Sequence, residues 1–143
     1  MTSRELEALV RIGKLKREAC SARECRGLVS SAEARLSDAA NAALTVDSRF
    51  DLAYNAAHAL ALAALRYRGY RSDDRYTVFQ VLPHTLGIAA SAVRVLATCH
   101  SRRNRAEYEG LLDVNETLIA ELLAAAHVLR DAVRALLLPG TSQ

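Results

Sequence analysis

The densest group of reactive side chains lies in one block, Arg102-Arg103-Asn104-Arg105-Ala106-Glu107-Tyr108-Glu109-Gly110. Guanidinium groups form paired hydrogen bonds to phosphates and carboxylates, and an amide and a phenol add further hydrogen bonds. If the block is helical, Asn104 and Tyr108 are four residues apart and lie on one face. The pattern therefore predicts a site for a phosphate group or for the phosphodiester of RNA. The open alternative is a solvated network of ion pairs that fixes the turn between two helices.

The residues before this block predict where it lies in the fold. Two parallel, mainly apolar rows with helical spacing begin at Ile88 and Ala89. The next helical steps in these rows are Arg102 and Arg103. Because both rows face the core, we expect the two arginines at the mouth of a helical bundle. There they would interact favourably with the negative end of the helix dipole.

The rest of the sequence predicts an all-α fold, an up-and-down bundle of four to five helices with short connections. Ala and Leu dominate the apolar residues and favour helix, and no segment alternates with period two for long enough to form a strand. The expected helical spans run from residue 2 or 3 to 20, then 21–44, 48–69, 76–82, from 88 onward, and 111–137.

Local signals support several of these boundaries. Ser21 with Glu24 forms a capping-box pattern for the second helix, and Asp47 or Ser48 is expected to cap the third. The third helix is apolar around most of its circumference, so we place it at the centre of the bundle. A break is expected between Pro83 and Gly87, and Pro139-Gly140 is expected to end the last helix.

Composition limits the class of protein. The 143 residues fit one domain spanning 1–143, and the net charge of +3 permits contact with a nucleotide, RNA or an acidic protein without requiring any of them. The three cysteines favour reduced thiols and a cytoplasmic location. The charged first residues exclude a signal peptide, and no uncharged run approaches the ~20 residues of a membrane span.

The histidines predict no metal site and no cofactor. No His-x3-His or Glu-x-x-His pair is present, and the cysteines have no second pair or close histidine. His84 follows a proline and is expected to border the predicted pocket, while His58 is interpreted as a core residue. The string from Arg94 to His100 is interpreted as accidental, because six helical residues place the two side chains on different sides of the helix.

Parts of the chain resemble the HEPN superfamily of helical bundles. Residues 51–65 (DLAYNAAHALALAAL) look like the third-helix signature of that family. Arg103-Asn104 followed by Tyr108 looks like its arginine-asparagine motif. Together with the segment Leu82–Gly87, the block most resembles a small bacterial subgroup. The resemblance covers about half of the chain.

This resemblance implies a homodimer that interacts with RNA or a nucleotide. Many HEPN proteins are metal-independent endoribonucleases, often toxins, and others are non-catalytic partners of nucleotidyltransferases, which in some toxin pairs modify a tyrosine near the motif. The implied ligand-binding residues are Arg102, Arg103, Asn104, Arg105, Tyr108 and His84. Among them, Arg103, Asn104 and Tyr108 are the catalytic candidates.

One departure leaves enzymatic activity open. Tyr108 stands where the family motif has its histidine, and a phenol with a pKa near ~10 is a poor general base at neutral pH. The first hypothesis is therefore a nucleotide- or RNA-interacting protein of a toxin–antitoxin or nucleotidyltransferase-partner system. The second is a non-catalytic protein–protein interaction module. The third is a metal-independent endoribonuclease toxin in which His84 or His100 serves as the base.

Overall fold

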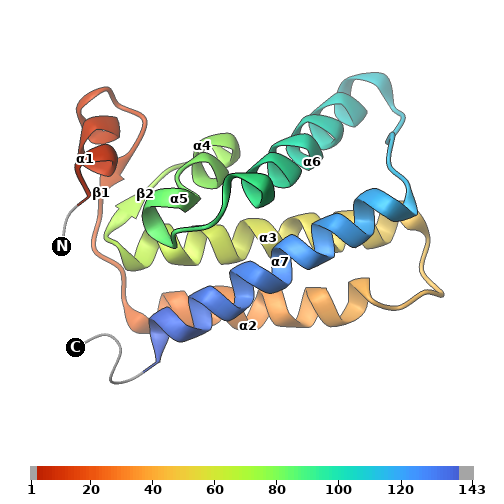
Figure 1. The fold of residues 1–143 in the computed structure, drawn as a ribbon, viewed down its shortest axis with the longest axis horizontal. Helices are drawn as coiled ribbons and strands as arrows, with labels where there is room; N and C mark the ends of the chain where they lie inside the picture. The colour runs from red at the N-terminus through yellow and green to blue at the C-terminus, as the bar shows by residue number, and fades with distance from the viewer. Residues whose placement is uncertain (1–2, 139–143) are drawn as a thin grey trace.

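The computed structural model describes residues 3–138, which form seven helices and one small two-stranded ribbon (Figure 1). This confirms the expected all-α fold, with four long helices and three short ones. In chain order the elements are α1 (Arg4–Arg11), β1 (Lys16–Arg17), α2 (Ala22–Ala39), α3 (Val46–Tyr67), β2 (Tyr70–Arg71), α4 (Arg75–Gln80), α5 (Leu82–Thr85), α6 (Ala90–Glu109) and α7 (Glu116–Leu137).

Helix α3 lies at the centre, as its apolar sequence predicts. Helices α2 and α7 pack along one side of it, and α4, α5 and α6 lie on the other (Figure 1). Small side chains allow close helix packing, because backbones approach where no bulky group intervenes. Seven alanines of α3 are buried, namely Ala53, Ala56, Ala57, Ala59, Ala61, Ala63 and Ala64.

Side-chain caps set the starts of the long helices. The predicted capping residue Ser21 accepts a hydrogen bond from the backbone N–H of Glu24 at 3.1 Å. Helix α3 begins earlier than expected, because Thr45 caps it by accepting from the N–H of Ser48 at 3.1 Å. The last helix begins at Glu116 rather than near 111, since the amide side chain of Asn115 supplies its cap.

The N-terminal segment differs most from the expectation. Helix α1 ends at Arg11 instead of continuing to residue 20, and Gly13 turns the chain with φ +82°. The chain then forms β1, which pairs antiparallel with β2 through Lys16↔Arg71 and Arg17↔Tyr70. Ser3 caps α1; the alternative start at residue 2 and the expected stop at 139–140 lie outside the described residues.

A buried arginine joins the N-terminal segment to the bundle. Arg66, in the last turn of α3, is only 1% exposed. Its Nε donates to the carboxylate of Glu24 at 2.8 Å. The guanidinium also donates to three backbone carbonyls, of Glu18 at 2.8 Å, Ala19 at 3.0 Å and Tyr70 at 3.2 Å. A buried charge requires such compensation, so this network explains why an arginine is tolerated in the core.

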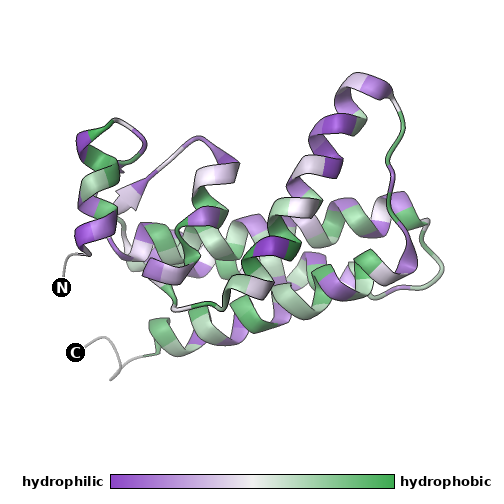
Figure 2. Cartoon of the chain, turned by 45° about the horizontal axis from the view of Figure 1, so that its top comes forward, coloured by the Kyte–Doolittle hydropathy of each residue, from purple (hydrophilic) through white to green (hydrophobic). Residues whose placement is uncertain are grey.

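Helix α6 divides into an apolar half and a polar half. Its first half packs on the bundle, while the polar C-terminal half rises away from α3 and α7 (Figures 1 and 2). Gly110, with φ +70°, ends the helix in the left-handed conformation. The arginine block thus lies at one margin of the bundle. None of the helices in the described part of the chain combines the length and apolarity needed to cross a membrane.

Candidate functional site

A cluster of aromatic side chains lies where α3, α4 and α6 meet. Helix α3 contributes Phe50, Tyr54 and His58, which are four residues apart and form one stripe. The Phe50 and Tyr54 rings stack with centroids 6.1 Å apart, and Phe79 of α4 meets Tyr54 edge-on at 5.8 Å. His58 also packs edge-on against Phe79, at 6.0 Å. These contacts hold α4 against α3 and fix the buried Tyr54 ring.

Tyr54 and Asn104 hold the imidazole of His100 between them. The Tyr54 hydroxyl lies 2.9 Å from Nδ1 of His100, and Nδ2 of Asn104 lies 3.0 Å from its Nε2. A neutral imidazole has one N–H, so one ring nitrogen donates while the other accepts. The tautomer of His100 and the orientation of the Asn104 amide are therefore linked, and both ring nitrogens are occupied.

Two arginines from different helices converge on the Tyr54 ring. The Cζ of Arg103 on α6 lies 5.2 Å from the ring centroid, and the Cζ of Arg75 on α4 lies 5.6 Å from it. Nη1 of Arg75 also donates to the side-chain oxygen of Asn55 at 3.0 Å. That amide in turn donates to the carbonyl of Asp51 at 2.8 Å. Each guanidinium has five N–H donors, so donors remain for a ligand.

The charge of these arginines is only partly balanced. Arg103 pairs with Glu107, one helical turn later, at 3.3 Å, and the Glu107 side chain is 59% exposed. Such exposed pairs contribute little. Arg75 forms no ion pair with any residue between 3 and 138. The two guanidiniums are therefore able to attract an anion, with the carboxylate of Asp74 near His100 acting against it.

Burial keeps the two histidines of the cluster neutral. It lowers the pKa of His58 to about 4, and the charges of Arg75 and Arg103 add to this effect. Burial also lowers the pKa of His100, although the nearby carboxylate of Asp74 opposes the shift. Neutral imidazoles at physiological pH serve as hydrogen-bond donors and acceptors, and as general bases where a ring nitrogen is accessible.

An exposed ring borders the cluster. Tyr76 directly follows Arg75 on α4, and its ring centroid lies 6.0 Å from that of His100. Its residue exposure is 49%, in contrast to the buried Tyr54. Aromatic rings beside guanidiniums provide surfaces on which unpaired nucleobases stack.

Arg103 also borders a pocket of different character. This pocket has a volume of about 310 Å³ and is lined by Asp47, Phe50, Asp51, Arg103, Ala106, Glu107 and Leu112. Its three carboxylates oppose an anion. A phosphate is therefore not expected in this pocket.

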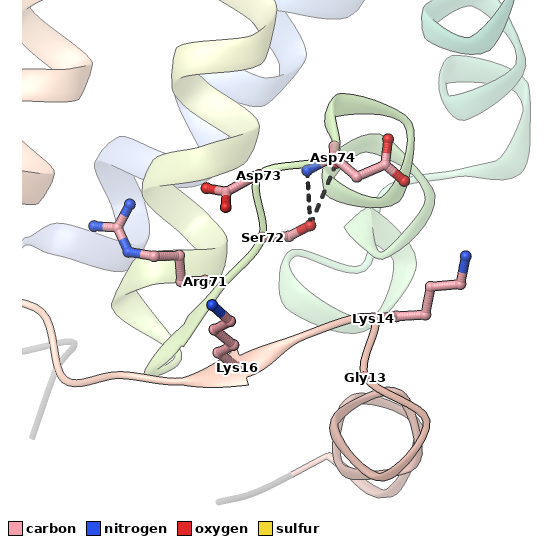
Figure 3. A pocket seen from close by; sticks show the side chains of 7 residues that line it. All are labelled: Gly13, Lys14, Lys16, Arg71, Ser72, Asp73 and Asp74. Carbon is pink, nitrogen blue, oxygen red and sulfur yellow. Dashed lines mark hydrogen bonds between the residues drawn. The ribbon is translucent and has the colours of Figure 1, made fainter.

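A second polar cleft lies beside the ribbon and holds mixed charges (Figure 3). It has a volume of about 260 Å³ and is lined by Gly13, Lys14, Lys16, Arg71, Ser72, Asp73 and Asp74. Arg71 pairs with Glu18. Asp74 caps α4 and accepts a hydrogen bond from the Thr77 hydroxyl at 2.7 Å, which holds its pKa below the usual range. These partners fix the turn before α4, so this cleft is the weaker candidate.

The structure gathers only part of the predicted block into the cluster. Arg103 and Asn104 lie in it. Arg102 points instead to Asp113, with 3.4 Å between Nη1 and the carboxylate, and holds the connection between α6 and α7. Arg105 is exposed.

Two other predicted site residues lie apart from Arg103. Tyr108 is 89% exposed and does not meet Asn104, whose amide turns back along the helix to His100. His84, on α5, has its Nδ1 3.5 Å from the carboxylate of Glu5 of α1.

Tyr54, Asn55, Arg75 and Tyr76 belong to the cluster although sequence reasoning did not single them out as site residues. One signal was available in the sequence. Tyr54 and His58 are polar-tipped rings four residues apart, and His58 is the one polar residue between positions 56 and 65. The position of Arg75 gave no such signal, because only the tertiary packing of α4 brings it to Tyr54.

Comparisons with known proteins add no relative. No protein-family model, no curated protein and no solved structure matches this chain.

Proposed function

We propose that the cluster around Tyr54 and His100 binds a phosphate group of RNA or of a nucleotide. The observation that carries this proposal is the convergence of Arg75 and Arg103 on one buried ring, at 5.6 and 5.2 Å, where Arg103 pairs with the exposed carboxylate of Glu107. Both guanidiniums border the same ring, so an anion bound beside it could accept hydrogen bonds from either of them. Arginine forks match phosphate oxygens, and the amide of Asn104 adds a further polar group at the same place.

Tyr76 supports a nucleic-acid ligand over an isolated inorganic anion. Its exposed ring lies beside His100 and next to Arg75, so a base and its phosphate fit neighbouring positions. The resemblance of residues 51–65 and of the arginine block to HEPN proteins favours the same ligand class. It also suggests a homodimer and a nucleotidyltransferase partner, within a toxin–antitoxin or related system.

The test is binding of a fluorescein-labelled single-stranded RNA, followed by anisotropy at low salt. Arg75→Gln and Arg103→Gln are each expected to weaken binding by about tenfold, because each removes charge-assisted hydrogen bonds to phosphate. Arg94→Gln is the matched control. Arg94 lies on the same helix and is exposed, so the variant removes an equal charge outside the cluster.

The comparison with Arg105→Gln separates two readings of the arginine block. If the cluster binds the ligand, Arg105→Gln behaves like the Arg94 control. If non-specific attraction to positive charge dominates, all four variants lose affinity equally, which contradicts the proposal. The proposal is also contradicted if Arg75→Gln and Arg103→Gln both bind the RNA with wild-type affinity.

A metal-independent endoribonuclease is the second candidate, and one observation favours it. His100 is a neutral imidazole in the same cluster as two guanidiniums, which are the groups that base catalysis and phosphate stabilisation require. Both of its nitrogens are engaged by Tyr54 and Asn104. Catalysis by His100 therefore requires the RNA to displace the Asn104 amide from Nε2.

Cleavage of RNA in the presence of EDTA tests this candidate. Loss of cleavage in both His100→Gln and Arg103→Ala, with retained cleavage in His84→Gln, would support His100 as the base. If wild-type protein binds RNA but leaves it intact, the enzyme reading fails and the binding module remains.

A further inference from the structure

Two thiols lie against each other at the start of α2. Cys20 Sγ and Cys25 Sγ are 3.1 Å apart, and both cysteines are free. The helix cap explains the arrangement, because Ser21 is the capping residue. Cys20 precedes the cap and Cys25 follows four residues after it. These are the positions whose side chains meet in the hydrophobic staple of a helix N-terminus.

The pair is accessible from one side. A pocket of about 320 Å³ opens on it, lined by Cys20, Ser21, Ala22, Cys25, Arg26, Tyr67 and Leu137. Cys20 is half-buried in this wall, while Cys25 is only 1% exposed. Arg26 forms no ion pair within residues 3–138, so its guanidinium is available to a carboxylate in the pocket.

We propose that Cys20 and Cys25 form a dithiol site that exchanges with a small, acidic disulfide such as oxidised glutathione. The pocket admits the disulfide to Cys20, and Arg26 attracts a carboxylate of the reagent. This site lies at the start of α2, apart from the Tyr54 cluster, and does not depend on RNA binding.

The exchange proceeds in two balanced steps. The Cys20 thiolate attacks one sulfur of the small disulfide, a mixed disulfide forms, and one small thiolate leaves. Cys25 then attacks Sγ of Cys20, the Cys20–Cys25 disulfide forms, and the second small thiol leaves with the Cys25 proton. The protein dithiol is oxidised by two electrons, and the small disulfide is reduced to two thiols.

The environment of each thiol sets this order. Cys20 faces the pocket and can meet a reagent from solvent. Burial raises the pKa of Cys25 to about 12, which keeps it a thiol until Cys20 is engaged beside it. Cys20 is therefore the attacking residue and Cys25 the resolving one.

The disulfide would fix the segment of residues 18–20, which covers Arg66. The carbonyls of Glu18 and Ala19, just before Cys20, accept hydrogen bonds from Arg66 at 2.8 and 3.0 Å. A covalent link from Cys20 to α2 restricts the separation of this segment from the bundle. Oxidation is expected to raise the thermal midpoint and to slow amide exchange at residues 18–20.

The test incubates the folded protein with oxidised glutathione and then alkylates the remaining thiols. A Cys99→Ala variant simplifies the result, because it leaves only the pair. We expect loss of both alkylation sites, a mass decrease of two hydrogen atoms and a bond between the tryptic peptides 18–23 and 24–26. Cys20→Ala should leave Cys25 unmodified, whereas Cys25→Ala should stop at the mixed disulfide. Arg26→Gln should slow formation of the mixed disulfide.

Three results would overturn the proposal. The first is persistence of both thiols in a glutathione buffer oxidising enough to close a model dithiol peptide. The second is a mixed disulfide on Cys20 that never resolves in the protein with Cys25 intact. The third is an equal rise in thermal midpoint for the Cys20→Ala/Cys25→Ala variant, which would show that oxidised glutathione acts elsewhere.

Discussion

The Tyr54 hydroxyl and Nδ1 of His100 lie 2.9 Å apart, although 46 residues separate them in the chain. This bond joins the central helix α3 to the start of the polar half of α6. The two arginines then lie around the same tyrosine ring, one from α4 and one from α6. Tyr54 therefore takes part both in the packing of α6 on α3 and in the candidate site.

The neutral histidines predict a dependence of stability on pH. Burial lowers the pKa of His58 to about 4, whereas the unfolded chain keeps a value near ~6.5. Between these values the unfolded state binds more protons, so the stabilisation is complete above the unfolded pKa and is lost as pH falls. The expected loss is about 3 kcal/mol in the free energy of unfolding.

Urea unfolding across this window measures the effect. His58→Leu should reduce the slope, leaving the smaller contribution of His100, whose pKa burial also lowers. Carboxylates such as Glu7, with its pKa lowered to about 2, also titrate in the lower part of this window, but their contribution is common to His58→Leu and wild type and cancels in the comparison. An unchanged slope in His58→Leu would show that this imidazole is not desolvated in the folded protein.

The proposed phosphate contacts predict a salt dependence. Each phosphate neutralised by an arginine releases counterions, so the slope of log K against log salt changes by about 0.7 per contact for a single strand. Arg103→Gln should reduce the slope by about this amount, and Arg94→Gln should leave it unchanged. If the plots of log K against log salt have the same slope for Arg103→Gln and wild type, Arg103 does not contact a phosphate of the RNA.

Substitution of Arg66, which lies far from the candidate site, is expected to destabilise the protein strongly. Arg66→Ala leaves Glu24 and three carbonyls without their donor, which should lower the free energy of unfolding by about 3 kcal/mol. Arg66→Lys should recover only part of it, because an ammonium cannot reproduce the planar fork. Denaturant unfolding measures both, with the exposed Arg94→Ala expected within about 0.5 kcal/mol of wild type. A loss no larger than that control would mean that water replaces the network.

Replacing each of two glycines by alanine is expected to change the stability of the protein in opposite directions. Gly110→Ala should destabilise the protein by about 1 kcal/mol, because φ +70° disfavours a side chain. Gly27→Ala should stabilise it by about 0.5 to 1 kcal/mol, since Gly27 is exposed inside α2 and an added Cβ meets nothing within 4 Å. Thermal unfolding compares them directly, and a change of the same sign in both would contradict the backbone argument.

Periodicity predicted the long helices well because each carries a continuous apolar face. It failed after Arg11, where the helix ends at a turn containing Gly13 and the following residues pair with Tyr70-Arg71. That pairing is between segments distant in sequence, so no local pattern encodes it. The start of the third helix was misplaced because Thr45, Asp47 and Ser48 are all residue types that cap helices, and the sequence does not show which of them does so.

The candidate site was predictable only in part, for a related reason. The apolar row correctly pointed Arg103 toward the core side of α6, where it meets Tyr54. The same reasoning did not separate Arg102, whose partner Asp113 lies in the next connection. Helical spacing predicted that Asn104 meets Tyr108. His100 is also four residues from Asn104, in the other direction, and its imidazole is held by Tyr54, so the amide of Asn104 bonds to His100 instead.

The buried alanines of α3 limit which substitutions this protein can accept. Seven buried alanines leave no space for larger side chains, and overpacking of a core typically costs about 1 to 3 kcal/mol. The central helix is therefore closed to gradual enlargement at these seven of its 22 positions. New ligand preferences would arise by substitution at the positions of α4 and of the polar half of α6 that border solvent, not at the buried Thr77, Val78 and Phe79. A library confined to those solvent-bordering positions should retain folding while it samples different ligands.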